Sequence, residues 1–190
     1  MRLRSTGVFL GLCVAALSWA APSSAQLSVT TFGASNARGC YIDASGPTTN
    51  TEQCDKALSE PLAERDLIAT LVNRGIIRNR AGKWTAAIAD FDQALARDPT
   101  TPEAWLNRGN SLLLMNKPDE AIANYEKALA NNLGEAHVAW HNIGLAWYAK
   151  ANLIRARAAF RKALELKPDF EESAAKLKEL EGKRGENDEP

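Results

Sequence analysis

Two histidines are the first side chains in this sequence with a spacing suited to chemistry. His137 and His141 lie four residues apart, so they share one face of a helix, where two imidazoles can bind a metal ion. The residues between them are Val, Ala and Trp rather than the glutamate of a metalloprotease helix, and no third ligand follows by spacing. The sequence also holds no glycine-rich phosphate loop, no Ser-His-Asp or Cys-His arrangement and no paired-acid cleft. We therefore expect no metal, no cofactor and no enzymatic activity.

Three asparagines recur at nearly one spacing and suit a different chemistry, the binding of a peptide backbone. Asn73, Asn107 and Asn142 each stand two residues before a glycine, and we call these three residues the Asn ladder. An amide side chain has both donors and an acceptor, so it can hold the N–H and C=O groups of an extended peptide whatever its sequence. Asn110, close to Asn107 on the same predicted helix, adds to this pattern. The alternative is that asparagine is merely tolerated on a polar surface.

The spacing of the Asn ladder belongs to a longer internal repeat. Gly75, Gly109 and Gly144 step by 34 and then 35 residues, and small and aromatic residues of the segments that follow keep the same step. This period, with two helices per unit, is typical of an antiparallel helix-pair solenoid, in which stacked pairs bury a core that one pair cannot bury alone. Apolar periodicity and breaks at Gly, Pro or Asn place these helices. They are predicted over 62–80, 84–97, 102–115, 118–131, 136–150, 153–166 and 170–182.

Residues 68–169 resemble the tetratricopeptide repeat family. The third unit is the most similar part of the chain, through Trp140, Ile143, Gly144, Trp147, Ala156, Phe160, Ala163 and Pro168. The resemblance implies an all-α fold, a right-handed helix-turn-helix solenoid. The predicted domain covers 62–183, with units at 68–101, 102–135 and 137–170 and a capping helix over 170–182. The last residues, 184–190, are charged and lack apolar periodicity, which predicts disorder.

The first helices of a stacked helix-pair solenoid line its concave face, where side chains one repeat apart follow one another. The resemblance therefore implies a peptide-binding groove. Its predicted lining is Asn73, Asn107, Asn110, Asn142, Ile76, Leu113, His141 and Tyr148. Members of the family that clamp a free C-terminal carboxylate use a Lys, asparagines and a basic pair, and only Asn107 matches that set. We therefore expect an apolar or mixed peptide surface and no carboxylate clamp.

Three arginines depart from the family pattern. Arg74 and Arg108 occupy a position that is usually Leu, and Arg78 occupies one that is usually aromatic. Because a long arginine stem can cover apolar surface, we expect these side chains to do so while their charged heads reach water.

The N-terminal part of the chain has a composition of its own. Residues 1–25 combine two early arginines, an apolar run of about a dozen residues and small residues before Gln26, the pattern of a secretory signal peptide. Its removal leaves Cys40 and Cys54, and an even pair in an exported protein predicts a structural disulfide rather than a redox site. Residues 26–61 are predicted to be an irregular leader that contains this disulfide and one short helix near 52–59.

These features favour a non-enzymatic protein-interaction module, periplasmic or secreted, in a bacterial cell envelope. Its partner would be another protein or a peptide segment bound in the concave groove. The alternative is a structural or assembly subunit of a larger envelope complex. Basic and acidic residues both number 23, and this neutral balance gives no support to a nucleic-acid partner. We also expect no membrane span once the signal peptide is removed.

Overall fold

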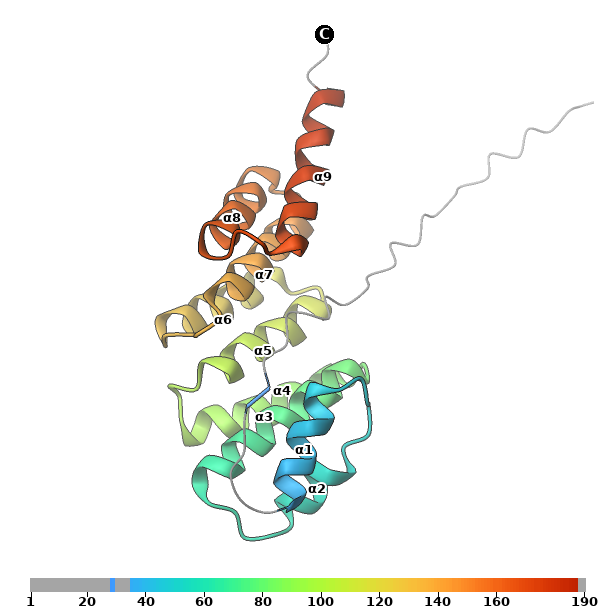
Figure 1. Ribbon diagram of the computed structural model, residues 1–190, viewed down its shortest axis with the longest axis vertical. Coiled ribbons are helices and arrows are strands. Elements are labelled where there is room, and N and C mark those ends of the chain that lie inside the picture. The colour runs from blue at the N-terminus through green and yellow to red at the C-terminus, as the bar shows by residue number, and fades with distance from the viewer. Residues whose placement is uncertain (1–27, 30–34, 188–190) are drawn as a thin grey trace, which may run out of the picture.

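The computed structural model describes residues 28–29 and 35–187, and over these residues the chain forms nine α-helices and no strand. The helices stack into an elongated array, with α1 and α2 at one end and α9 at the other (Figure 1). Their bounds are α1 Ser35–Ser45, α2 Glu52–Leu58, α3 Glu64–Arg80, α4 Trp84–Arg97, α5 Pro102–Leu114, α6 Pro118–Ala130, α7 Ala136–Ala149, α8 Leu153–Leu166 and α9 Glu171–Asn187.

Helices α3 to α8 form three antiparallel pairs, as the repeat predicts. Each pair packs most extensively within itself, and its second helix packs against the first helix of the next pair. The predicted bounds agree with these six helices to within two residues. The last helix is longer than predicted and reaches Asn187, so the prediction of disorder is wrong for 184–187. Residues 188–190 lie outside the described residues.

The turn inside each pair repeats one backbone geometry. Gly82, Asn116 and Ala151 occupy equivalent positions and have left-handed φ angles of 72°, 58° and 55°. The next residue in each turn donates its backbone N–H five residues back, to Arg78, Leu112 and Trp147. This is a helix-ending arrangement that satisfies otherwise unpaired carbonyls. Glycine suits it, asparagine tolerates it, and alanine is strained in it.

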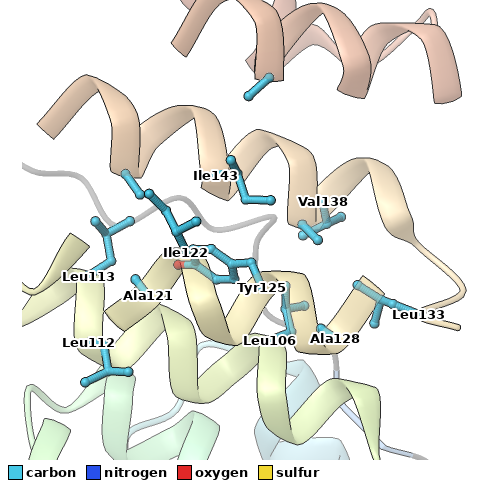
Figure 2. Close-up of a cluster of buried hydrophobic side chains, with 13 residues drawn as sticks. Leu106, Leu112, Leu113, Ala121, Ile122, Tyr125, Ala128, Leu133, Val138 and Ile143 are labelled. Atoms are coloured by element: carbon cyan, nitrogen blue, oxygen red, sulfur yellow. The ribbon is translucent and has the colours of Figure 1, made fainter. Parts of the chain in front are cut away.

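The repeated glycines admit an aromatic ring from the second helix of their own pair. A Cβ atom on Gly75, Gly109 or Gly144 would lie 2.4 or 2.5 Å from a ring carbon of Phe91, Tyr125 or Phe160 respectively. This contact is the physical reason that a glycine recurs in the first helix of each pair. Tyr125 is fully buried in the central cluster between the second and third pairs (Figure 2).

The prediction of an irregular leader over 26–61 with one short helix near 52–59 is wrong for 35–45, which form α1. Ala37, Cys40 and Ala44 are buried on one side of this helix, and α1 packs against both α2 and α3. The guanidinium of Arg80 donates to the carbonyls of Ala44 and Asp43 at its C-terminal end. A short helix of small residues is therefore held by distant partners, which local periodicity does not reveal.

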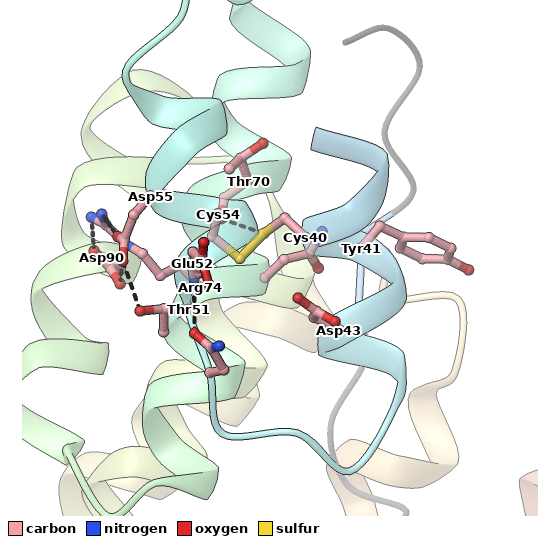
Figure 3. Close-up of a disulfide and its surroundings, with 12 residues drawn as sticks. Cys40, Tyr41, Asp43, Thr51, Glu52, Cys54, Asp55, Thr70, Arg74 and Asp90 are labelled. Carbon is pink, nitrogen blue, oxygen red and sulfur yellow. Dashed lines mark hydrogen bonds and ion pairs between the residues drawn. A yellow bond between two sulfur atoms is a disulfide. The ribbon is translucent and has the colours of Figure 1, made fainter. Parts of the chain in front are cut away.

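The predicted disulfide is present and joins Cys40 of α1 to Cys54 of α2 (Figure 3). The two helices thus form a covalently closed hairpin that continues the stack beyond α3. The predicted signal peptide, 1–25, lies outside the described residues. Among the helices that are described, none has the length and apolarity that crossing a membrane requires.

Candidate peptide-binding site

The first member of the Asn ladder already holds a peptide backbone. Asn73 lies on α3 and is fully buried. Its Oδ1 accepts the backbone N–H of Val29 at 2.9 Å, and its Nδ2 donates to the carbonyl of the same residue at 2.8 Å. Val29 belongs to no helix or strand. The predicted two-sided amide contact therefore exists at Asn73, and the backbone that it holds is the chain's own.

The second member of the ladder is also buried, but with different contacts. Nδ2 of Asn107 donates to the carbonyl of Glu103 one turn earlier on α5, at 2.9 Å. The amide of Asn110 approaches its Oδ1 at 3.4 Å. Among the described residues, Asn107 thus contacts its own helix, whereas Asn73 binds the backbone of Val29. The backbone carbonyl of Asn107 also joins two helices, because Nδ2 of Asn79 on α3 donates to it at 3.3 Å.

The third member pairs with the fourth predicted asparagine. Nδ2 of Asn142 on α7 donates to Oδ1 of Asn110 on α5 at 2.9 Å, and the hydroxyl of Tyr125 donates to the same oxygen at 3.0 Å. Asn110 therefore joins two repeats to each other. Asn142 is 1% exposed, and its Oδ1 has no hydrogen-bond partner among the described residues. A buried amide oxygen without a donor is unusual and costs stability.

Successive first helices are joined by polar contacts that share one offset. Ser111 donates to Asn79 at 2.7 Å, Asn142 to Asn110 at 2.9 Å, and the hydroxyl of Ser173 lies 2.9 Å from Nδ1 of His141. In each case the two residues are 32 positions apart. The contacts run from α3 to α5, α7 and α9 along the stack. The sequence analysis missed them because it compared residues at the repeat period, 34 or 35 apart, which never meet in this way.

His141 does not line an open groove, because it is buried against α9, and Tyr148 is half-buried with its hydroxyl bonded to α9. The ring of His141 is 2% exposed and lies between the rings of Phe160 and Phe170. The hydroxyl of Tyr148 donates to Glu179 of α9 at 3.1 Å. Burial lowers the pKa of His141 to about 4, so the imidazole is neutral at physiological pH. The prediction that these two side chains are open to a peptide is corrected accordingly.

Ile76 and Leu113 are core residues rather than groove residues. Ile76 is fully buried in a cluster that includes Cys40, Ala44 and Val72, so α1 contributes to its burial. Leu113 is buried in the central cluster shown in Figure 2. The prediction that they form an open apolar lining is therefore wrong. For Ile76 it failed because local periodicity does not reveal that α1 packs on the first pair.

The charged heads of Arg74 and Arg78 were predicted to reach water, but they form ion pairs inside the structure instead. Arg74 and Arg78 both donate to the carboxylate of Asp90 on α4, each with an N···O distance of 2.7 Å. The side chain of Asp90 is 0% exposed. Arg74 also reaches Asp55 on α2 at 2.8 Å, so one guanidinium connects three helices (Figure 3). Burial raises the pKa of Asp90, and the two guanidinium groups oppose that rise.

The Arg–Asp contact has a counterpart one repeat further on. Arg108 donates to Oδ1 of Asn124 at 3.0 Å and forms an ion pair with Asp92 at 2.7 Å. Asn124 is equivalent to Asp90, and Arg108 is equivalent to Arg74. In both units an arginine that replaces the usual Leu occurs together with a polar residue 16 positions later, Asp90 or Asn124. This co-occurrence was the signal in the sequence for the contact, and it was overlooked.

The two histidines lie near each other without a further metal ligand. The rings of His137 and His141 both contact the ring of Phe170, with centroids 4.9 and 5.3 Å away. Within the part of the chain that the structure describes, no group of three or more His, Cys, Asp or Glu side chains could hold a metal ion. A pocket of about 320 Å³ lies beside His137, lined by side chains of both charges. Burial, and then the charge of Lys167, lower the pKa of His137.

Fold and site together define a helical-repeat protein with buried amides on its first helices, and the family comparisons agree. Models of the tetratricopeptide repeat match residues 102–134 and 137–170, and a further model of the same repeat matches residues 75–116. The chain therefore belongs to the tetratricopeptide repeat family.

The curated relatives match about half of this chain. The chain is 35% identical over 102 residues to the human protein O-mannosyl-transferase TMTC1, a match that covers 50% of this chain and 12% of that protein. It is 31% identical over 86 residues to the rat NADPH oxidase activator 1, which covers 45% of this chain and 18% of the relative. The chain thus spans less than a fifth of the length of either relative.

Solved structures share the fold. The first TPR domain of human RPAP3 superposes with a TM-score of 0.59 and 24% identity, over 65% of this chain and 98% of that one. The second RPAP3 domain, solved in complex with an HSP70 peptide, gives 0.57 and 22% over 63% and 98%. MamA from Desulfovibrio magneticus gives 0.62 and 19% over 80% and 87%.

Proposed function

We propose that this protein is an exported interaction module that holds an extended segment of a partner protein against its first helices. Tetratricopeptide repeats are protein-interaction modules, generally without catalytic activity, and their stacked pairs present long concave surfaces. The identity of the partner's side chains matters less in this mode than the path of its backbone, because an amide side chain recognises groups that every residue carries.

One observation carries this proposal, the contact between Asn73 and Val29. The amide of Asn73 binds the N–H and the C=O of a single residue, at 2.9 and 2.8 Å. Both distances are ordinary for hydrogen bonds. A side chain in this orientation suits any extended backbone that follows the same path. Asn107 and Asn142 extend the proposed site to the second and third pairs.

The proposed partner is not a C-terminal carboxylate. Val72 and Val138, at positions where carboxylate-clamping members of the family carry basic residues, are both buried and apolar here. An internal, extended segment of mixed polarity fits the described surface better.

An oxidising compartment is proposed as the site of action. The disulfide between Cys40 and Cys54 is of a kind that persists in secreted and periplasmic proteins and is rare in a reducing cytosol. The predicted signal peptide at 1–25 points the same way. Expression with the native N-terminus, followed by fractionation of periplasm and medium, tests this part. Recovery of full-length protein in the cytosol with reduced cysteines would contradict it.

Peptide selection followed by calorimetry tests the binding mode. Peptides from a displayed random library are selected on the full chain, and their affinities are then measured against Asn73→Ala, Asn107→Ala and wild-type protein. Loss of one amide contact should weaken binding about tenfold, the effect of roughly one to two kcal/mol of hydrogen bonding. Asn131→Ala is the matched control, because this asparagine donates to the carbonyl of Lys127 at the end of α6, away from the first helices. Equal affinities for all four proteins would refute the proposal.

A further inference from the structure

The segment Ser28–Val29 is fixed to the array at several points. The backbone of Val29 is bound on both sides by Asn73. Its side chain packs against the buried cluster that includes Leu71 and Val72 of α3 and Cys40 of α1. The hydroxyl of Ser28 lies 3.0 Å from the hydroxyl of Ser45, the last residue of α1. The segment therefore contacts both the N-terminal hairpin and the first pair.

These contacts have the chemistry expected of a bound peptide ligand. The main chain supplies the hydrogen bonds, and one β-branched side chain supplies the apolar contact, as in recognition of extended segments generally. Asn73 is fully buried while Val29 is in place, so a partner's backbone cannot reach its amide group. Entry of a partner at this position thus requires that Val29 leave.

We propose that Ser28–Val29 is a resident occupant of the Asn73 position, and that an external extended peptide binds there by displacing it. This inference rests on the proposed function for its second half only. The resident segment also indicates the sequence that a competitor should resemble, a small polar residue followed by a β-branched one. A site occupied most of the time binds an external ligand more weakly in proportion to the fraction that is open.

Amide hydrogen exchange tests the resident contact without any partner. In the full chain with its disulfide formed, the N–H of Val29 should exchange at least tenfold more slowly than in Asn73→Ala. Asn131→Ala should leave the protection of Val29 unchanged. An unprotected Val29 in the wild-type protein would overturn the inference. Because loss of Asn73 could disturb α3 itself, the exchange of α3 amides is followed in the same experiment.

A second variant leaves α3 intact and tests displacement. Val29→Pro removes the backbone N–H that Asn73 accepts. A synthetic peptide with the sequence QLSVTTFGA, that of residues 26–34, is titrated into the full-length wild-type and Val29→Pro proteins. We expect about tenfold tighter binding to Val29→Pro, and loss of this gain when Asn73→Ala is added. Equal affinity for the wild-type and Val29→Pro proteins would overturn displacement.

The two experiments separate this inference from the proposed function. Protection of Val29 that depends on Asn73, together with tighter peptide binding to Val29→Pro, supports both. Protection of Val29 with no peptide binding to either protein would overturn displacement and the proposed function, and would make Ser28–Val29 a fixed part of the fold. Library peptides that bind through Asn107 while Val29 stays protected would preserve the function but overturn displacement at Asn73.

Discussion

The two ends of the array are covered in physically different ways. At the N-terminal end, α1 and α2 are joined by a disulfide and connected to α3 and α4 through Arg74, Asp55 and Asp90. At the C-terminal end, α9 packs on α8, and Phe170 and Ser173 at its start contact His141 of α7. The N-terminal end is thus held by a covalent bond and ion pairs, whereas the C-terminal end is held through a neutral imidazole. One end should therefore respond to reduction and the other to acid.

One pair of equivalent positions in the repeat shows how the same backbone accommodates different side-chain contacts. The pair that contacts across the first unit is Arg74 with Asp90, and in the second unit it is Arg108 with Asn124. The equivalent residues of the third unit are Ile143 and Ala159, both buried in the central cluster. Along the array this pair thus changes from an ion pair to a hydrogen bond and then to two apolar residues, while the helix geometry stays constant. The repeat fixes the packing distance, and the chemistry at that distance is free to vary.

Removal of Asp90 should give the largest effect on stability. Asp90→Ala leaves Arg74 and Arg78 without their shared buried carboxylate, and loss of one partner of a buried ion pair costs about 4 kcal/mol. Urea denaturation monitored by circular dichroism measures the change. Asp92→Ala is the matched control on the same helix, since its ion pair with Arg108 is half exposed and should contribute less than about 1 kcal/mol. Similar losses of stability for both variants would contradict a stabilising role of the buried contacts of Asp90 with Arg74 and Arg78.

Loss of the disulfide should weaken the N-terminal end by somewhat less. The double variant Cys40→Ser/Cys54→Ser removes a bond between residues 14 apart in sequence, which corresponds to about 3 kcal/mol in the chain-entropy model. Hydrogen exchange should show faster opening of α1 and α2 while α8 and α9 keep their protection. Uniform loss of protection over all helices would mean that the two ends do not behave as separate regions.

Acid should weaken the C-terminal end through His141. Its pKa is about 4 in the folded protein and near 6.5 when unfolded, so the unfolded state binds the proton first as the pH falls. Stability is therefore complete above pH 6.5 and is lost as the pH falls toward 4, by about 2 kcal/mol at pH 5. Glu172 and Lys176 of α9 and His137 of α7 also act on this imidazole. Urea titrations at pH 7.5 and pH 5 measure the difference.

A His141→Gln variant isolates this effect, because glutamine does not titrate. The part of the pH dependence that belongs to His141 should disappear in it, whatever the variant's absolute stability. An unchanged difference between pH 7.5 and pH 5 would show that acid sensitivity comes from elsewhere in the chain.

The smallest effect expected is in the turns that join the paired helices. Ala151 has φ 55°, a left-handed conformation that glycine adopts without strain. Ala151→Gly should stabilise the third unit by about 0.5 to 1 kcal/mol, the relief of strain less the added flexibility. At the equivalent position of the first unit, Gly82→Ala should destabilise by a similar amount. Thermal unfolding should show a higher melting temperature for Ala151→Gly and a lower one for Gly82→Ala. A change in the same direction for both variants would contradict this explanation of the turns.

Local signals were enough to predict most of the fold. Helix ends could be placed from turn residues such as Gly82 and from prolines such as Pro102, because these act on the backbone of their immediate neighbours. The disulfide between Cys40 and Cys54 could be predicted because these two cysteines remain once the predicted signal peptide is removed. Helix α1 could not be predicted, because its stability comes from contacts with α3 and from Arg80, far away in sequence.

The candidate site was less predictable, for a related reason. Alignment by repeat identified Asn73 correctly as a residue able to hold a backbone, since that ability belongs to the amide itself. It could not show that Val29 would supply the backbone, or that α9 would contact His141 and Tyr148. Segments outside the repeats contact these side chains, and periodicity within the repeats contains no information about such segments.

The side-chain amide resonance of Asn73 gives the most direct test of how this protein binds a partner. It is followed by nuclear magnetic resonance while a library-selected peptide is titrated into the full-length Val29→Pro protein, with Asn131 as the internal control. We predict that the Asn73 NH₂ signals shift in step with the calorimetric binding curve while those of Asn131 stay in place. Saturating peptide binding with no change at Asn73 would contradict the account.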